Sequence, residues 1–311
     1  MFVSILMPSY NYAPFLREAI DSVLNQTWRD FELLIADDGS TDSSWEILNQ
    51  YAAQYPDKIR IFRHPGNRNA GIAATYQLAF RHARGDFLAF LEADDTWHPH
   101  CLETRLRGFQ SFPEAGVITS AYDLQGDPLG CLYWSIYQTV NGLSLNSRSP
   151  QNTLSFYLRR NPAASFTHFM LRRSVYEAIP DPASIELFYD WWILAHAAAS
   201  STFVHLPERL SIWRIHPKSA NYGPVDHAKL VRLKSFLNKL YLSLERLDLT
   251  PPQRKILAKE RGRMLNYPGF LEGKAYQELV KEPVESLRFL CHMNLNRLLM
   301  KRRYEKTAAK S

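Results

Sequence analysis

The sequence predicts an α/β fold with a mixed, mostly parallel sheet, helices on both faces of that sheet, and a helical C-terminal appendage. Short apolar runs alternate with segments of helical periodicity through the first half of the chain, as they do in βαβ units. Acidic pairs follow two of these runs, and the C-terminal part is basic with a helical pattern. The composition, 46% hydrophobic and 22% charged residues, is ordinary for a folded protein.

The elements are predicted from hydrophobic periodicity. Strand-like runs lie at Val3–Met7, Phe31–Ala36, Ile59–Arg63, Phe87–Leu91, Gly116–Tyr122, Ser165–Leu171, Thr202–Leu206 and Leu210–Ile215. Helical patterns lie at about Pro14–Gln26, from Ser43 towards Gln54, and at Gly71–Arg84, Pro99–Phe112 and about Asp190–Ser200. The spacing of Ser43 and Glu46 is that of a capping box. The irregular stretch Asp123–Pro162 is predicted to shape a substrate cleft.

Positive charge is concentrated near the C-terminus. Residues Met1–Tyr222 carry 18 Lys and Arg against 22 Asp and Glu, a net charge of −4, whereas Gly223–Ser311 carries 19 against 9, a net charge of +10. Such a region fits an anionic partner, either a membrane surface or a polyanion, or else a solvated helical face; no nucleic-acid partner is expected. An apolar stripe followed by Lys301–Arg303 suits a membrane-surface helix and equally a helix packed on the body. The stripe consists of Leu287, Leu290, Cys291, Leu295, Leu298 and Leu299.

Cysteine usage and the N-terminus favour a reducing, cytoplasmic location. The three cysteines, Cys101, Cys131 and Cys291, are odd in number and far apart, unlike a disulfide framework or a zinc site. The apolar start Met1–Met7 has no basic leader and no small-residue cleavage site, so it is interpreted as a strand. No apolar run approaches the roughly 20 residues of a membrane-spanning helix. Any membrane contact is therefore expected to be peripheral.

Acidic side chains fall at the ends of three predicted elements, at Asp37-Asp38, Asp94-Asp95 and Asp190. Adjacent carboxylates repel one another, so a cation or a hydrogen-bond donor is expected beside them. The second pair is the strongest candidate for Mg²⁺ or Mn²⁺, which prefer carboxylate and phosphate oxygens. The glycine-rich motifs of dinucleotide enzymes and P-loop NTPases are absent from the sequence. Without these phosphate-binding motifs, the charge of a bound diphosphate has to be neutralised in another way. A metal held by Asp95 is the simplest candidate.

Four segments resemble motifs of the family 2 glycosyltransferases, which have the GT-A fold. They are Val3–Asn11, Ala19–Thr27, Asp37–Asp42 and Leu91–Asp95, in the order and spacing of the family. The resemblance covers roughly residues 2–219. It implies a GT-A domain at 1–220, with a nucleotide-sugar half at about 1–115 and an acceptor half at about 116–220. The basic helical region at 221–311 lies outside it.

The resemblance places the donor base at the ends of the first two strands. Pro8 and Tyr10 are expected at the base, with Tyr10 stacked on uracil, and Asp38 is expected to accept a hydrogen bond from uracil N3–H. An aromatic face and a carboxylate are what a planar base with an imide donor needs. Asn69 and Gly71 match the stretch before the third helix, which packs beside the nucleotide in that family.

By the same resemblance, the residues around the diphosphate come from two distant segments. Asp94 is expected near the ribose, and Asp95 is expected to bind the metal that bridges the diphosphate. His216 belongs to a segment similar to the family's Arg-x-His-x-x-Ser and is expected to reach the metal or the diphosphate. Glu92 replaces the more usual Asp two residues before the Asp-Asp pair, and Thr75-Tyr76 stands where Arg-Asn is common. These departures put details of donor binding in doubt.

The general base of the family is an acidic residue that opens a later helix, in a segment usually written Glu-Asp-Trp-x-Leu-Trp. Phe188–Leu194 aligns with this segment, which implies that Asp190 is the base and puts Tyr189 where the Glu would be. A carboxylate in the first turn of a helix also stabilises the free N–H groups there, so a capping role is an alternative for Asp190. The two roles are compatible.

The resemblance implies an inverting, metal-dependent glycosyltransferase. The expected donor is a UDP-sugar, the expected cofactor Mg²⁺ or Mn²⁺, and the expected acceptor a hydroxyl of a saccharide or lipid-linked saccharide, in the synthesis of cell-surface polysaccharide or glycoconjugate. Two alternatives stay open. One is a nucleotide-sugar-binding module without turnover, which Tyr189 makes conceivable. The other is a sugar-nucleotide pyrophosphorylase, although this N-terminus lacks the Gly-rich, Arg-containing loop of those enzymes.

Overall fold

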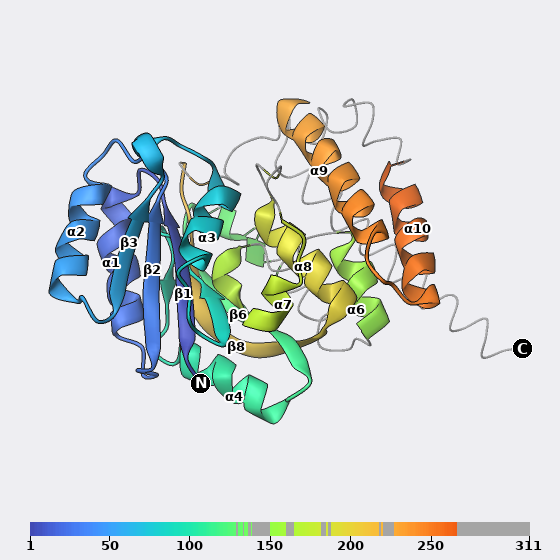
Figure 1. Ribbon diagram of the computed structural model, residues 1–311, viewed down its shortest axis with the longest axis horizontal. Coiled ribbons are helices and arrows are strands. Elements are labelled where there is room, and N and C mark those ends of the chain that lie inside the picture. Colours follow the sequence, from blue (N-terminus) through green and yellow to red (C-terminus); the bar gives the residue numbers. More distant parts are fainter. Residues whose placement is uncertain are drawn as a thin grey trace, which may run out of the picture.

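The fold is seen in a computed structural model (Figure 1). The structure describes residues 1–128, 130–132, 134–135, 138, 150–159, 165–181, 185, 188–217, 219 and 227–265. The strands are β1 Val3–Ser9, β2 Phe31–Asp37, β3 Ile59–Arg63, β4 Phe87–Phe90, β5 Thr96–Trp97, β6 Ala115–Gly126, β7 Phe169–Arg172 and β8 Thr202–Ile215. The helices are α1 Ala13–Leu24, α2 Ser44–Gln54, α3 Ile72–Phe80, α4 Cys101–Ser111, α6 Pro150–Tyr157, α7 Arg173–Glu177, α8 Tyr189–Ser200, α9 His227–Glu245 and α10 Pro251–Leu265, with 3₁₀ turns η1 Pro65–Asn67 and η2 Phe166–His168.

All eight described strands form one mixed sheet in the order β3-β2-β1-β4-β7-β6-β8-β5. The first four of these are parallel to one another, and β6 is parallel to β8. β7 runs antiparallel to both β4 and β6, and the short β5 is antiparallel to β8. The predicted mixed, mostly parallel sheet is therefore confirmed. Because β1, β2 and β4 are parallel neighbours, their C-terminal ends meet at one edge.

Helices cover both faces of the sheet because alternate strand residues point to opposite sides. In β1, Ile5 and Met7 pack with α1, α2 and α4, while Leu6 packs with α3, α6, α7 and α8 on the other face. All three side chains are fully buried, and burial of such a side chain stabilises the fold by roughly 1.5–3 kcal/mol. The two helical layers are visible on either side of the strands in Figure 1.

The C-terminal helices α9 and α10 lie beside α8 and α6 (Figure 1). Their apolar side chains belong to the same core cluster as α8. The hydroxyl of Tyr241 on α9 donates to the carbonyl of Leu158 at 2.9 Å, and Glu260 on α10 pairs with Arg159 at 2.8 Å while its side chain is 1% exposed. α9 and α10 therefore share one hydrophobic core with α6 and α8.

The structure differs from the predicted elements in several places. The first half of the predicted strand Ser165–Leu171 is the 3₁₀ turn η2, and only its second half belongs to β7. β6 continues to Gly126 and α6 occupies 150–157, so the stretch predicted as irregular contains regular structure at both ends. The two runs predicted after α8 form the single strand β8, with register shifts against β6. Ser43 lies at the start of α2 but its side chain makes no capping hydrogen bond; Asp42 Oδ1 accepts from the Ser44 amide instead, at 3.0 Å.

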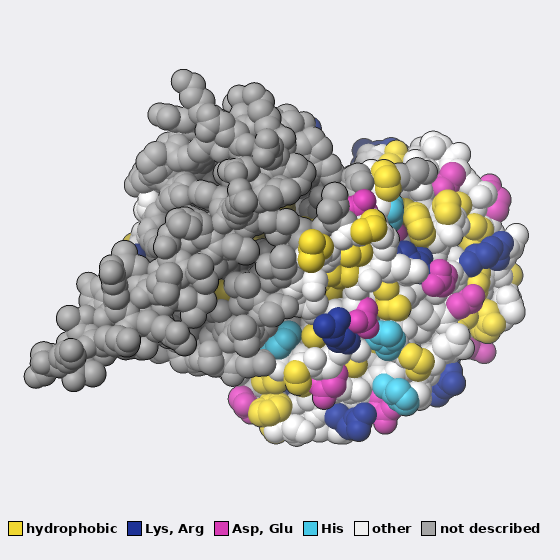
Figure 2. Space-filling model, turned by 180° about the vertical axis from the view of Figure 1, so that it is seen from behind, with side chains coloured by type: hydrophobic (Ala, Val, Ile, Leu, Met, Phe, Trp, Pro, Cys, Tyr) yellow, Lys and Arg dark blue, Asp and Glu magenta, His cyan; other side chains and the backbone are white. Residues whose placement is uncertain are grey.

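The described surface mixes both signs of charge. On the face opposite to Figure 1, Lys and Arg side chains are interspersed with Asp and Glu over the described part (Figure 2). Among the described residues, none of the helices has the length and hydropathy needed to cross a membrane. The apolar stripe predicted at Leu287–Leu299 and the basic Lys301–Arg303 lie outside the described residues, so the membrane-surface helix stays a prediction.

Candidate functional site

Three carboxylates gather in the loop between β4 and β5. Oxygens of Glu92, Asp94 and Asp95 all lie within 4.8 Å of one another, and this is the one group of potential metal ligands found among the described residues. Asp95 is fully buried and Asp94 is 5% exposed. The cluster begins directly after β4, which ends at the same sheet edge as β1 and β2. The acidic pair predicted there is thus extended by Glu92.

Donors from later parts of the chain hold Asp95 in place. Thr167 Oγ1 donates to Asp95 Oδ2 at 2.5 Å, and the backbone N–H of Arg214 donates to Asp95 Oδ1 at 3.0 Å. Ser165 Oγ lies 3.0 Å from Glu92 Oε2 and 3.3 Å from Asp95 Oδ2, so its single proton serves one of the two carboxylates at a time. The position of Asp95 therefore depends on η2 and β8.

The acidic cluster is electrostatically unfavourable on its own. Burial raises the pKa of Asp95 well above its ordinary value, and repulsion by Asp94 raises it further. Burial likewise raises the pKa of Glu92, with contributions from Asp94, Asp95 and Asp190. Either protons or a cation must neutralise such a group. Oxygen ligands of this kind suit Mg²⁺ or Mn²⁺, so the residues present fit a divalent cation.

His216 reaches the cluster through Asp94. Its Nε2 lies 3.1 Å from Asp94 Oδ2, and its ring stacks on Phe15 with centroids 4.5 Å apart. Tyr12 meets the edge of the same ring at 6.0 Å, and burial together with the neighbouring Asp94 raises the pKa of the Tyr12 phenol strongly. The structure thus brings His216 to the acidic cluster through Asp94, and the expected contact of His216 with the metal or the diphosphate stays a prediction.

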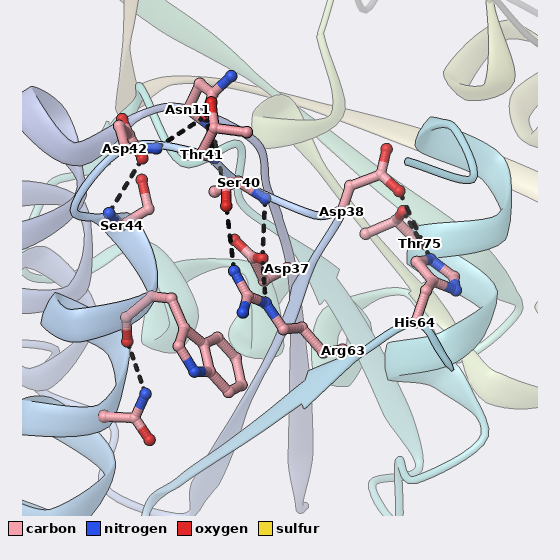
Figure 3. Close-up of polar contacts among 12 residues, drawn as sticks. Asn11, Asp37, Asp38, Ser40, Thr41, Asp42, Ser44, Arg63, His64 and Thr75 are labelled. Carbon is pink, nitrogen blue, oxygen red and sulfur yellow. Dashed lines mark hydrogen bonds and ion pairs between the residues drawn. The ribbon is translucent and has the colours of Figure 1, made fainter. Parts of the chain in front are cut away.

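The residues after β2 separate into two contact networks (Figure 3). Asp37 points into the first network, where its Oδ1 accepts from Arg63 Nε at 2.7 Å and from the Ser40 amide at 3.0 Å. Asn11, which has a positive φ of 56°, braces the same loop by accepting from the Thr41 amide at 2.8 Å. Asp37 is thus used to hold the loop, and Asp38 is the member of the pair that faces the other way.

Asp38 is held against the segment before α3. Its two oxygens accept from the amides of Ala70 at 2.7 Å and Gly71 at 3.1 Å, and His64 Nε2 lies 3.6 Å from Oδ1 (Figure 3). Gly71 has φ 87°, a left-handed conformation that only glycine adopts easily. His64 also contacts Thr75 Oγ1 at 3.1 Å. Asp38 and Gly71, each expected at the donor site, are therefore in direct contact, and their role in donor binding stays a prediction.

The remaining predicted donor-site residues differ in exposure. Pro8 is buried within β1, paired in register with Ala36 of β2. Tyr10 follows the end of β1 with 44% of its surface exposed, one of the largest exposed aromatic side chains in the described chain. Asn69 is exposed beside Ala70. Tyr10, Asp38 and Asp95 thus lie at the ends of three adjacent parallel strands, on one edge of the sheet.

Asp190 lies in the first turn of α8, where its Oδ1 accepts from the Trp191 amide at 2.8 Å. The charge of Asp190 contributes to the raised pKa of both Glu92 and Tyr76, so it lies within electrostatic range of the acidic cluster. The preceding residue Phe188 has φ 62°, a left-handed conformation that costs a non-glycine residue on the order of 1–2 kcal/mol. The chain therefore enters α8 through a strained turn.

Tyr189 belongs to the core. It is 2% exposed, its hydroxyl lies 2.6 Å from that of Tyr176, and Gln77 Nε2 donates to it at 2.9 Å. Burial raises the pKa of Tyr189 to about 12. Its ring packs against Tyr76 and Phe166. The aromatic at the position of the family's Glu is therefore a packing residue beside Asp190.

Several residues of the site were not predicted. Ser165, Thr167 and the backbone of Arg214 hold Asp95, and Tyr12 contacts Asp94. Tyr12 directly follows the motif Val3–Asn11, so its place near the end of the first strand could have been predicted. Arg214 is the Arg of the segment similar to the family's Arg-x-His-x-x-Ser, although that motif does not indicate a backbone contact with Asp95, 119 residues away. For Thr167, 72 residues from Asp95, the sequence offers no local signal.

Comparison with solved structures shows the fold. The chain is similar to S. aureus TarS 1–349 in complex with UDP-GlcNAc, with a TM-score of 0.63 and 17% identity over 88% of this chain and 78% of that one. It is also similar to the mannosyltransferase PcManGT from Pyrobaculum calidifontis in complex with GDP-Man and Mn²⁺, with a TM-score of 0.61 and 17% identity over 99% and 84%. The predicted GT-A-like fold is confirmed by these likenesses.

Comparison with curated proteins shows the family. An uncharacterized glycosyltransferase of Nostoc sp. is 33% identical over 223 residues, 70% of this chain and 65% of that protein. The chondroitin synthase of Pasteurella multocida is 38% identical over 107 residues, 34% of this chain and 11% of that protein. The chain thus spans less than two thirds of the length of these relatives. The family model described as "Glycosyl transferase family 2" matches residues 4–179, more than half of the chain, and the protein therefore belongs to glycosyl transferase family 2.

Proposed function

We propose that the protein transfers a sugar from a UDP-sugar to a hydroxyl group of a saccharide or lipid-linked saccharide. The observation that carries the proposal is that Asp38 and the loop with the Asp95 cluster follow neighbouring parallel strands, while the charge of Asp190 acts on Glu92 of that cluster. A nucleotide-binding carboxylate, a cation site and a base are the three groups that such a transfer needs. Synthesis of a cell-surface polysaccharide or glycoconjugate, in the cytoplasm and peripheral to the membrane, is the setting we propose.

The donor site is proposed to lie over the ends of β1 and β2. Tyr10 is exposed there and offers an aromatic face for a base, while Asp38 offers carboxylate oxygens for the imide N–H of uracil. A structural neighbour binds UDP-GlcNAc and another binds GDP-Man with Mn²⁺. Both donors are nucleoside diphosphate sugars, which supports that class. Asn69 and Gly71 flank the same site.

The proposed cofactor is Mg²⁺ or Mn²⁺. Asp95 would hold it, together with Asp94 and Glu92, and His216 would orient Asp94 by its contact at 3.1 Å. When bound, the cation would offset the negative charge that develops on the departing nucleoside diphosphate. The raised pKa values of Glu92 and Asp95 support this assignment, because a cation relieves the repulsion that raises them.

Asp190 is proposed as the general base of an inverting displacement. Its carboxylate takes the proton of the acceptor hydroxyl while that oxygen forms a bond to the anomeric carbon of the sugar. The bond between the anomeric carbon and the diphosphate oxygen breaks, and the nucleoside diphosphate leaves with both bonding electrons. The attack comes from the face opposite the leaving group, so the configuration inverts. A positioned base contributes about 10²–10⁴-fold to the rate.

The proposal is tested by titrating UDP-glucose, UDP-GlcNAc and GDP-mannose into the protein by calorimetry, with and without Mn²⁺. Binding of a UDP-sugar that requires Mn²⁺ is expected, and UDP release should fall by about 10²–10⁴-fold in Asp190→Asn while UDP binding persists. Persistence of binding separates loss of the base from loss of the fold. UDP release that is unchanged in Asp190→Asn, or absent from the wild type with every donor, would favour the nucleotide-sugar-binding module.

A further inference from the structure

A helix from outside the family match packs directly on the turn that carries Asp190. The family model ends at residue 179, and α9 begins at His227. The ring of Phe236 on α9 lies 5.3 Å from the ring of Phe188 and 5.4 Å from that of Trp191, centroid to centroid. These two residues flank the Tyr189-Asp190 pair in the chain. Phe236 is 5% exposed, so the contact is part of the core.

Phe188 needs an external support for its conformation. Its φ of 62° and ψ of 32° place it in the left-handed region, which a side chain with a Cβ adopts only when its surroundings hold it there. Phe188 is followed by the first turn of α8, and its carbonyl accepts from the Trp192 amide at 3.0 Å. The dihedral angles at Phe188 therefore set the direction in which α8 starts, and with it the position of Asp190.

Trp191, which follows Asp190 in the chain, is held by α6 and α9. Trp191 Nε1 donates to the carbonyl of Tyr157 at the end of α6, and the Trp191 side chain is 7% exposed. The Phe236 ring thus contacts both the strained turn and the anchored indole, whose rings also meet each other edge to face at 6.3 Å. We propose that Phe236 is a positioning residue, which holds the left-handed turn at Phe188 and so aims the Asp190 carboxylate at the acceptor. This inference rests on the proposed function of Asp190 as the base.

Without the Phe236 ring, Phe188 can relax towards negative φ, and Asp190 moves with the first turn of α8. Displacement of a catalytic group by about 1 Å can cost on the order of 10²-fold in rate. Phe236→Ala is therefore expected to lower kcat by about 10- to 100-fold at an unchanged KM for the donor, because the donor site at β1 and β2 is remote from α9. Phe236→Leu, which keeps an apolar contact, is expected to lose only about two- to fivefold.

Leu244→Ala is the matched control. Leu244 is fully buried on the same helix and in the same core cluster. Its neighbour Ser243 lies 2.9 Å from His196, which is six residues, or about 9 Å, further along α8 than Asp190. Leu244→Ala should lower the melting temperature about as much as Phe236→Ala, yet change kcat by less than about twofold.

The experiment measures release of the nucleoside diphosphate by the full chain with Mn²⁺, which is UDP from UDP-GlcNAc and UDP-glucose and GDP from GDP-mannose, together with melting temperatures. A kcat loss in Phe236→Ala no larger than that in Leu244→Ala would overturn the positioning role, as would a crystal structure of Phe236→Ala in which Phe188 keeps its left-handed φ. If Phe236→Ala does not fold, Phe236→Leu is compared with Leu244→Ala by the same criterion. Product release that does not depend on Asp190 would instead refute the proposed function, and the inference with it.

Discussion

At the level of single residues, Tyr189 shows how a departure from a family motif acquires a structural role. The family motif has Glu at this position, yet the Tyr189 hydroxyl contacts Tyr176 and Gln77 inside the core. A carboxylate at this depth would be an uncompensated buried charge. The exchange therefore removes one acidic group near Asp190 and supplies packing in return. It does not by itself remove the proposed base, which is the next residue in the chain, Asp190.

We predict that Tyr189→Phe lowers the free energy of unfolding by about 1–3 kcal/mol, because Gln77 and Tyr176 lose a buried hydrogen-bond partner. UDP release should stay within a few-fold of the wild type. Tyr189→Glu, in contrast, should destabilise the fold by more than about 3 kcal/mol. Urea unfolding followed by circular dichroism and a UDP-release assay checks both statements. A large loss of turnover in Tyr189→Phe at wild-type stability would show that the phenol takes part in the reaction.

The sequence predicts the acidic groups of the site but not the groups that hold them. Asp38 and Asp95 directly follow strands, and the C-terminal ends of parallel strands meet, so their shared edge is predictable. The donors to Asp95 come from Thr167 and Arg214, far along the chain. Hydrogen bonds of this range depend on how β7 and β8 are placed in the sheet. No local pattern encodes that placement.

At the level of elements, the turn before α3 holds the Asp38 carboxylate, which is proposed to bind the uracil of the donor. Gly71 has φ 87° and donates its amide to Asp38 at 3.1 Å. A Cβ at Gly71 would meet no described atom within 4 Å, and the same is true of Gly66, which has φ 70°. Both glycines have positive φ, but ψ is 17° at Gly66 and 163° at Gly71, and the latter region is essentially restricted to glycine. Of the two, Gly71 is the one whose amide donates to Asp38.

We predict that Gly66→Ala lowers the free energy of unfolding by about 1–2 kcal/mol, the cost of left-handed backbone for alanine. Gly71→Ala is expected to lower it by about 1–3 kcal/mol, because alanine rarely adopts the conformation of Gly71. Gly71→Ala alone should weaken UDP binding, by about tenfold if the turn changes conformation, because the Asp38 contact shifts. Calorimetric titration of UDP measures this difference, with Gly66→Ala as the control. Equal UDP affinity in the two variants would separate the Gly71 turn from nucleotide binding.

Most elements are predictable from periodicity, and the exceptions have physical reasons. β3 is predicted to the residue, and α1, α2 and α4 within about two residues of each end, because each has a clear apolar face. Helix α3 ends at Phe80 instead of Arg84. β8 is continuous through Pro207 although its apolar pattern is interrupted there, since pairing with β6 and bulges bridge the interruption. Tertiary pairing of this kind is invisible to a local reading.

At the level of the whole molecule, the acidic cluster couples folding to pH. Burial raises the pKa of Glu92 and Asp95 above the ordinary carboxyl values of about 4, whereas unfolding restores those values. The folded, metal-free protein therefore binds more protons than the unfolded chain above about pH 4. The stability from these groups is fully present below that pH and is lost as the pH rises through the raised folded-state values.

We predict that Mn²⁺ raises the melting temperature more at pH 8 than at pH 5, because the cation replaces protons that the cluster holds at lower pH. Melting curves with and without Mn²⁺ across this range measure the effect. Asp95→Asn should abolish most of it, which ties the response to this cluster and not to surface carboxylates. A Mn²⁺-induced shift that does not change with pH would contradict the assignment.

The architecture as a whole is predictable in its layers but not in its C-terminal packing. Alternating strands and helices predict the sheet and its two helical covers, and the basic composition beyond residue 220 predicts helices, of which α9 and α10 are described. The division into 1–220 and 221–311 stays a prediction. Nothing in the sequence indicates that Phe236 meets Phe188, because that contact depends on how α9 lies across α8.

The hydrogen bond from the Arg214 amide to Asp95 has a consequence for synthesis of the protein. The two residues are 119 positions apart, and β8, which carries Arg214, is the last strand of the sheet to leave the ribosome. A nascent chain that ends after α4 already contains all three carboxylates but none of the later donors. The edge that would bind a cation therefore closes late, so unfinished chains should neither capture metal nor consume nucleotide sugar.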